Sequence, residues 1–325
     1  MISQAELDKL IAKGQIDAND VLLLRRAMNG DDHRISANEA EALFQINDAC
    51  AGKGNEWPDF FVEALVDYLV NQADPRGYVS QEHADWLIAQ ISSSGVAKSA
   101  TELEALVKVM EAAHSVPENL EVFAMEQVKQ AVLSGEGPTR RGGELEAGQI
   151  GRAEVEILRR VLYACGSDDA VAISRTEAEL LFDINDAVAD ASNDASWPDL
   201  FVKAIANYLM ASRGFQSPSR QDALRRESWL DDDTTDVGGF FGKILSGGLR
   251  GILSSYNDDG EDRLKRQAAD ITASETVTAD EADWLAERIG RDGQFADAEK
   301  ALLLFIKTES PDIHPSLKPL LEEVA

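Results

Sequence analysis

The chain has 325 residues, and its 59 acidic side chains outnumber its 31 lysines and arginines, which gives a net charge of −28 at pH 7. A surface this negative repels nucleic-acid phosphates, so we expect no nucleic-acid partner. It suits cations or a basic protein partner, although a well-solvated surface alone would account for it. The two cysteines, Cys50 and Cys165, form neither a disulfide framework nor a cysteine-rich metal site, as is typical of a reducing compartment.

The first fifteen residues, MISQAELDKLIAKGQ, have the pattern of an amphipathic helix. They lack the basic start and the continuous apolar run of a secretory signal. The chain also has no uninterrupted apolar run of about 18 residues, the length that a membrane-spanning helix needs. We therefore expect a soluble, cytoplasmic protein.

The predicted helices begin at a recurring signal, in which an aliphatic residue is followed by Ser, Thr or Asp and then by an acid three positions later. The cap oxygen can accept a hydrogen bond from the free N–H groups of the first turn, and the acid can bond back to the N–H of the cap. The pattern predicts such starts at Ser3–Glu6, Asp17–Asp20, Ser36–Glu39, Ser174–Glu177 and Thr278–Glu281.

The sequence contains an internal duplication. The segment EAEALFQINDA at 39–49 returns as EAELLFDINDA at 177–187 with nine of eleven residues identical, and WPDFFVEALVDYLV at 57–70 returns as WPDLFVKAIANYLM at 197–210 with eight of fourteen identical. Further matches in the same order join 14–28 to 148–162 and 82–91 to 280–289. Matches repeated in one order along the chain predict two tandem copies of one unit.

The spacing of the matches predicts the domain boundaries. The offset between the copies is 140 residues for the match of 57–70 with 197–210 and 198 residues for the match of 82–91 with 280–289. This difference places an insertion of 58 residues in the second copy, at about 211–276. We expect a first unit at 1–133, a Gly-rich linker at 134–148 and a second unit at 149–325.

Both copies are predicted to be helical. In 57–70 the apolar residues recur at intervals that form one stripe on a helix and cannot form an alternating strand. Pro58 and Pro198 suit the first turn of a helix, where a missing N–H group costs nothing. The fold class is therefore all-α, with five or six helices around one core in each copy, no strands, and Trp57, Trp86, Trp197 and Trp284 as core anchors.

The insertion contains the segment VGGFFGKILSGGLRGILSSY at 237–256, which has one apolar face if it is helical. Its six glycines would cost about 5–6 kcal/mol in a free helix, so the helix needs a surface to lie against. That surface could be the protein's own helices, a protein partner, a second copy, or a membrane, the last disfavoured by the flanking acids. The predicted contact residues are Phe240, Phe241, Ile244, Leu245, Leu249, Ile252 and Leu253.

Two short segments end like a hand-type calcium loop, with a hydrophobic residue, a serine and a glutamate three positions later. They are MNGDDHRISANE at 28–39 and GSDDAVAISRTE at 166–177, and neither has the acidic first position or the central glycine of such a loop. A divalent cation would therefore need a different coordination. The candidate ligands are Asp31, Asp32 and Glu39 in the first copy and Asp168, Asp169 and Glu177 in the second.

The same residues carry a resemblance to a known family. The acidic turn Asp31–Asp32 leads into Ile35, Ser36, Glu39 and Glu41, and Asp168–Asp169 lead into Ile173, Ser174, Glu177 and Glu179. This pattern resembles the TerB-like helical domains of tellurite-resistance proteins over about a third of each copy. The resemblance implies an α-helical fold, a role for clustered acids in cation binding, and work in stress-linked or membrane-associated assemblies.

The sequence shows no catalytic signature. The histidines His33, His83, His114 and His314 form no pair at metal-ligand spacing, and no Gly-rich phosphate loop follows a strand. The pairs Asn47–Asp48 and Asn185–Asp186, which occur in both copies, are expected to end their helices, or to join Asp59 and Asp199 in a polar site.

We therefore expect a non-enzymatic helical interaction or scaffold protein that binds a protein partner or itself, without a small-molecule substrate or a cofactor. The alternative is a protein that binds or senses a divalent cation.

Overall fold

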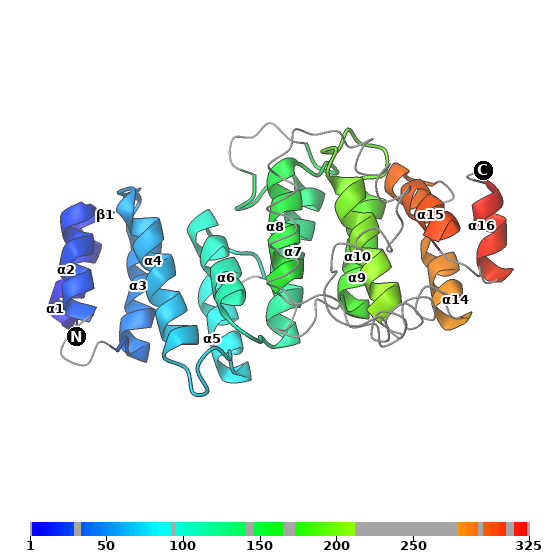
Figure 1. The fold of residues 1–325 in the computed structure, drawn as a ribbon. Helices are drawn as coiled ribbons and strands as arrows, with labels where there is room; N and C mark the ends of the chain where they lie inside the picture. The colour runs from blue at the N-terminus through cyan, green and yellow to red at the C-terminus, as the bar shows by residue number, and fades with distance from the viewer. Residues whose placement is uncertain are drawn as a thin grey trace, which may run out of the picture. The chain divides into compact units, whose positions relative to one another are not determined.

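The computed structural model describes residues 2–28, 34–92, 95–140, 146–164, 173–211, 279–291, 295–309 and 315–323 (Figure 1). The described chain is all-α apart from one pair of two-residue strands, which confirms the predicted fold class. The chain divides into two compact units. Unit 1 comprises residues 1–147 and 156–165, and unit 2 comprises residues 148–155 and 166–325, so that helix α8 (Arg152–Ala164) contributes to both.

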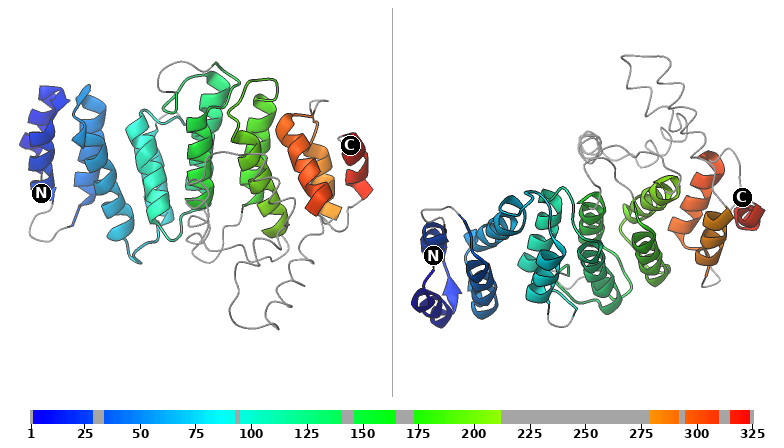
Figure 2. Two further views of the ribbon diagram at one scale, coloured as in Figure 1. Left: turned by 45° about the horizontal axis from the view of Figure 1, so that its top comes forward. Right: turned by 90° about the horizontal axis from the view of Figure 1, so that it is seen from below.

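Unit 1 is a two-layer stack of helices (Figure 2). Contacts join α1 to α3, α3 to α5 and α5 to α7 in one layer, and α2 to α4 and α4 to α6 in the other. Their bounds are α1 (Gln4–Lys13), α2 (Ala18–Met28), α3 (Ala37–Ala49), α4 (Glu56–Val66), α5 (Gln81–Ile91), α6 (Ala100–Ala112) and α7 (Glu118–Ser134). Stacked helix pairs of this kind bury apolar faces only against their neighbours, as in helical repeat proteins.

Two local features differ from the sequence prediction. Strand β1 (Gln15–Ile16) pairs in parallel with β2 (Gly52–Lys53), where no strand was expected, because the turns that follow α1 and α3 run side by side and exchange backbone hydrogen bonds. The helix predicted over 57–70 is interrupted, since α4 ends at Val66 and a π-helical turn, η1 (Asp67–Asn71), follows it.

The predicted helix starts are confirmed where the structure describes them. Capping boxes with both reciprocal hydrogen bonds are present at Ser3–Glu6, Ser36–Glu39 and Ser174–Glu177. Asp17 and Asp20 exchange the same pair of bonds at the start of α2, at 2.9 and 3.2 Å. Thr278 lies outside the described residues.

Unit 2 contains α9 (Arg175–Ala187), α10 (Trp197–Ala211), α14 (Ala279–Arg288), α15 (Asp297–Glu309), the 3-10 turn η2 (Pro315–Leu317) and α16 (Lys318–Glu323). Helix α10 packs on α9 and α15, and α16 packs on α15 and η2.

The two units have matched aromatic cores. In unit 1 the ring of Phe44 meets the rings of Phe61 and Trp86 edge-on, at 5.1 and 5.8 Å between centroids. In unit 2 Phe182 meets Phe201 and Trp284 in the same way, at 5.0 and 5.5 Å. Trp57, Trp197 and Trp284 are buried and Trp86 is half-buried, so the predicted anchors do lie in the cores. The duplication itself remains an inference from the sequence.

Candidate functional site

An open groove runs along α4, η1 and α6 in unit 1. It has a volume of about 360 Å³. Val62 and Val66 are apolar residues of its lining, which also includes four carboxylates and one lysine. The complete lining is Pro58, Asp59, Val62, Glu63, Val66, Asp67, Asn71, Glu104 and Lys108. A lining that combines apolar and acidic residues matches a partner segment that has one apolar and one basic face.

Two carboxylates of the groove already bind arginines of unit 1. Arg25 of α2 pairs with Glu63 at 2.7 Å, and the hydrogen bond from this arginine lowers the pKa of Glu63 below its ordinary value. Arg160 of α8 pairs with Glu104 at 2.8 Å. Two of the four carboxylates in the groove lining are thus paired with guanidinium groups of the same unit.

The remaining two carboxylates of the groove differ from each other. Asp67 accepts a hydrogen bond from the amide of Asn71 at 2.7 Å. Asp59 is exposed at the start of α4 and, within the described part of the chain, has no ionic partner. Asp59 is therefore the carboxylate that is open to a cationic group from outside.

The corresponding surface of unit 2 has a different character. By the sequence match, Lys203 stands in place of Glu63, and it pairs with Asp199, the counterpart of Asp59, at 2.9 Å. Asn207 stands in place of Asp67, and its side-chain oxygen accepts a hydrogen bond from the N–H of Ile173. The acidic character of the groove is thus particular to the first copy.

The predicted metal ligands fall into two groups. Glu39 and Glu177 are described, and both cap helices: Glu39 accepts from the N–H and hydroxyl of Ser36 at 3.0 and 2.7 Å, and from the N–H of Ile2 at 3.3 Å. Asp31, Asp32, Asp168 and Asp169 lie outside the described residues. Within the described ranges no group of three or more potential ligands could hold a metal ion. Cation binding stays a prediction that depends on the four aspartates.

The predicted contact face of the insertion also lies outside the described residues. This applies to Phe240, Phe241, Ile244, Leu245, Leu249, Ile252 and Leu253. In the part of the chain that is described, no helix combines the length and the apolarity needed to cross a membrane.

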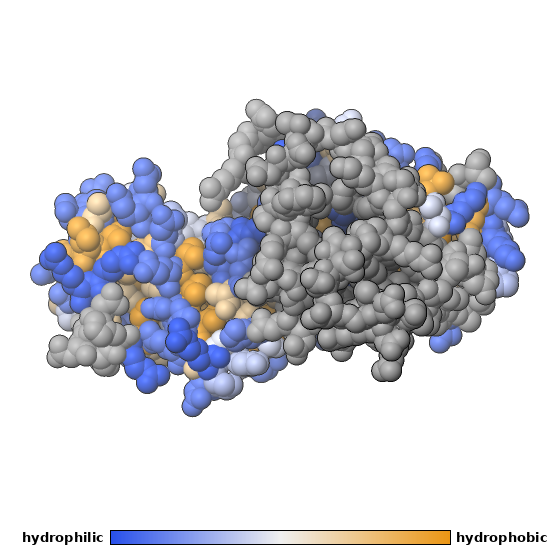
Figure 3. Space-filling model, in the orientation of Figure 1, coloured by the Kyte–Doolittle hydropathy of each residue, from blue (hydrophilic) through white to orange (hydrophobic). Residues whose placement is uncertain are grey.

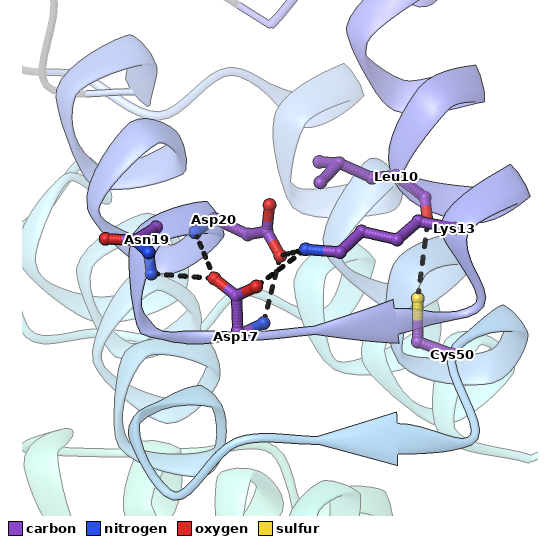
Figure 4. Close-up of polar contacts among 6 residues, drawn as sticks. All are labelled: Leu10, Lys13, Asp17, Asn19, Asp20 and Cys50. Atoms are coloured by element: carbon purple, nitrogen blue, oxygen red, sulfur yellow. Dashed lines mark hydrogen bonds and ion pairs between the residues drawn. The ribbon is translucent and has the colours of Figure 1, made fainter.

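A polar cluster fixes the N-terminal helix pair (Figure 4). The ammonium group of Lys13 lies between Asp17 and Asp20, at 2.7 and 2.6 Å from their carboxylates. The buried thiol of Cys50 donates to the carbonyl of Leu10 at 3.7 Å, and burial raises the pKa of this thiol. A raised thiol pKa disfavours the reactive thiolate. The buried side chain of Cys50 is therefore suited to packing and poorly suited to act as a nucleophile.

A buried polar chain in unit 1 was missed by the sequence analysis. The indole N–H of Trp57 donates to Asn47 Oδ1 at 3.0 Å, and Asn47 Nδ2 donates to Glu102 Oε1 at 3.0 Å. Asn47 lies in the last turn of α3, which ends at Ala49, one residue after the Asn47–Asp48 pair; its buried side chain bonds Trp57 and Glu102 and does not join exposed Asp59 in a polar site. The only signal in the sequence was the repeated pairing of asparagine and tryptophan, because Trp197 donates to Asn185 in the same way at 3.3 Å.

Comparison of the chain with family models, curated proteins and solved structures gives no match. The TerB-like resemblance therefore stays a prediction.

Proposed function

We propose that the chain is a non-enzymatic, acidic helical scaffold protein of the cytoplasm, built from two copies of one unit, and that the groove on α4, η1 and α6 binds a basic segment of a protein partner. The observation that carries the proposal is the pairing of Glu63 and Glu104 with arginines, next to the open carboxylate of Asp59. The net charge of −28 supports it, because long-range attraction would speed the encounter with a basic partner.

The proposal is tested by titrating the full chain with a fluorescent amphipathic peptide of about 18 residues, whose helix has a leucine face and a lysine face. Binding is followed by anisotropy. We expect Asp59→Asn to weaken binding roughly fivefold, because it removes one charge-assisted hydrogen bond from the groove. Binding should also weaken as salt is added, since the contacts are exposed and screened.

Asp199→Asn is the matched control. It removes the same charge from the first turn of the corresponding helix in unit 2, where the carboxylate is already paired with Lys203. Any non-specific attraction to an acidic protein would fall equally in both variants. Equal affinities of the two variants, or no binding by the wild type, would overturn the proposal.

A further inference from the structure

Arg160 holds helix α8 against helix α6 in unit 1. Arg160 donates from both terminal nitrogens to Glu104, at 2.9 and 2.8 Å, and from Nε to Glu111 at 2.6 Å. The two glutamates lie seven residues apart on one face of α6, and Val107 between them is only 1% exposed. A helix that carries Arg160 is thus anchored across this face of α6.

Helix α2 is the sequence counterpart of α8, with Arg26 in the place of Arg160. It packs its other face, with Val21, Leu24 and Met28, toward α4. The counterpart of the anchoring face carries Leu22 and Leu23, which are 51% and 61% exposed, and Arg26, which is also exposed. Arg26 forms no ion pair within the described ranges. Figure 3 shows apolar surface at this N-terminal end of unit 1.

Helix α15 is the sequence counterpart of α6. The buried residues of the two helices are in register, since Glu102, Leu106 and Val109 correspond to Glu299, Leu303 and Ile306, and all six are buried. In this register Leu304 takes the place of Val107, yet it is 48% exposed. Helix α15 therefore leaves open the face that α6 uses to hold α8.

The open faces of α2 and α15 both carry exposed leucines, so they suit an apolar contact with each other. The α8–α6 contact is ionic, with Glu104 and Glu111 on α6. At the corresponding positions α15 has Ala301 and Thr308. Arg160 and two glutamates thus make the contact within unit 1 ionic, whereas both open faces carry exposed leucines, beside Arg26 on α2.

We propose that α2 of one copy of the chain docks on α15 of a second copy, in the arrangement that α8 adopts on α6, so that chains associate head to tail. Helices that leave a face without a neighbour in stacked helical proteins normally carry polar residues on it, and apolar ones favour continued stacking. The contact joins two different surfaces, so it is heterologous and can extend beyond a dimer. It goes beyond the proposed function, because neither face belongs to the acidic groove.

A single helix-on-helix contact is smaller than a standard protein interface, so we expect a dissociation constant on the order of 100 μM. The net charge of −28 on each copy opposes association. Added salt screens this repulsion and leaves the apolar contact intact, so association should strengthen between about 0.05 M and about 0.5 M salt. A contact held by ion pairs would weaken over the same range.

The test is sedimentation velocity of the full chain over a concentration series, with Leu23→Asp and Leu304→Asp as variants. Each variant alone should remain monomeric. A mixture of the two should form a dimer and no larger species, because Leu304→Asp keeps its α2 face and Leu23→Asp keeps its α15 face. Leu133→Asp is the control, since Leu133 is 47% exposed on α7, outside both faces; it should associate as the wild type does.

Three results would overturn the proposal: a wild type that is monomeric at every concentration, a mixture that does not dimerise, or a Leu304→Asp variant that still associates while Leu23→Asp does not, which would indicate that α2 pairs with itself. Thermal unfolding confirms that each variant folds, and Leu22→Ser/Leu23→Ser replaces Leu23→Asp if the charge disturbs α2. A chain that binds the basic peptide but stays monomeric contradicts only this inference and leaves the proposed function standing.

Discussion

Buried acids lie in the first turns of the helices, and most of them are caps. Glu39, Glu177 and Glu299 accept hydrogen bonds from the backbone at the start of their own helices. Glu102 of α6 is different, because it is fully buried, Oε1 accepts from Asn47, and Oε2 has no hydrogen-bond partner. Burial raises the pKa of Glu102 above its ordinary value, since an ionised carboxylate loses its hydration there.

This difference predicts that Glu102→Gln stabilises the chain by about 1 kcal/mol at pH 7, because a buried carboxylate with one unpaired oxygen is replaced by a neutral amide. The effect should depend on pH. Near pH 3 the Glu102 carboxyl is protonated in both the folded and the unfolded chain, and its burial then costs little free energy. As the pH rises, Glu102 ionises first in the unfolded chain, so the free energy of unfolding of the wild type falls relative to that of the variant. Urea unfolding between pH 4 and pH 8 measures the difference.

Glu299 is the matched control for that prediction, as the sequence counterpart of Glu102. Its two oxygens accept from the N–H groups of Gly290 and Ala296, at 3.1 and 2.8 Å. Glu299→Gln should therefore destabilise the chain by about 1 kcal/mol, since one backbone N–H group loses its acceptor. Destabilisation by both substitutions would show that Glu102 is held as a satisfied anion.

Among the helices of unit 1, α8 is joined to α6 by the ion pairs of Arg160 with Glu104 and Glu111. Burial alone would raise the pKa of Glu111, but the hydrogen bonds from Arg160 and Lys108 outweigh it and hold this pKa below its ordinary value. The side chain of Arg160 is mostly buried, so its pairs are screened less than surface ion pairs.

Arg160→Ala is expected to destabilise the chain by about 2 kcal/mol at pH 7, because three charge-assisted hydrogen bonds are lost and two glutamates are left without their main partner. The contribution is complete above the ordinary pKa of glutamate. It disappears as the pH falls through the lowered pKa of Glu111, so the two proteins should converge in acid. Thermal unfolding at a series of pH values follows this.

Arg26→Ala provides the comparison, because Arg26 is the sequence counterpart of Arg160 and is exposed. Its effect on the monomer should lie within about 0.5 kcal/mol, as for other surface substitutions. A loss as large as that of Arg160→Ala would mean that α2 is already anchored within its own chain, which would also count against head-to-tail docking.

The sequence predicted the helices and their starts because capping and apolar periodicity are local signals. Ser36–Glu39 needs only four residues, and the stripe in α4 only a few turns. It did not predict the pairing of Asn47 with Glu102 or of Arg160 with Glu104, because these pairs join residues more than fifty positions apart. The groove was missed for the same reason, since α4 and α6 contribute its walls from separate segments. The two-residue strands carry too little pattern to be predicted.

Two surfaces of the chain are proposed to bind different partners. The acidic groove of unit 1 would bind a basic partner, and the apolar faces of α2 and α15 would join copies. Such a chain would present one acidic groove per copy along an assembly, so that a partner with several basic segments would bind by avidity. The insertion at about 211–276 would add a further contact surface.

Hydrogen exchange of the full chain, with and without the basic amphipathic peptide and analysed by mass spectrometry, locates the surface to which the peptide binds. We predict slower exchange in α4, η1 and α6 on addition of the peptide, in the wild type and in Asp199→Asn, and much less in Asp59→Asn. Unchanged exchange in these elements at saturating peptide, or slowing confined to other helices, would contradict the claim that the groove is the binding site.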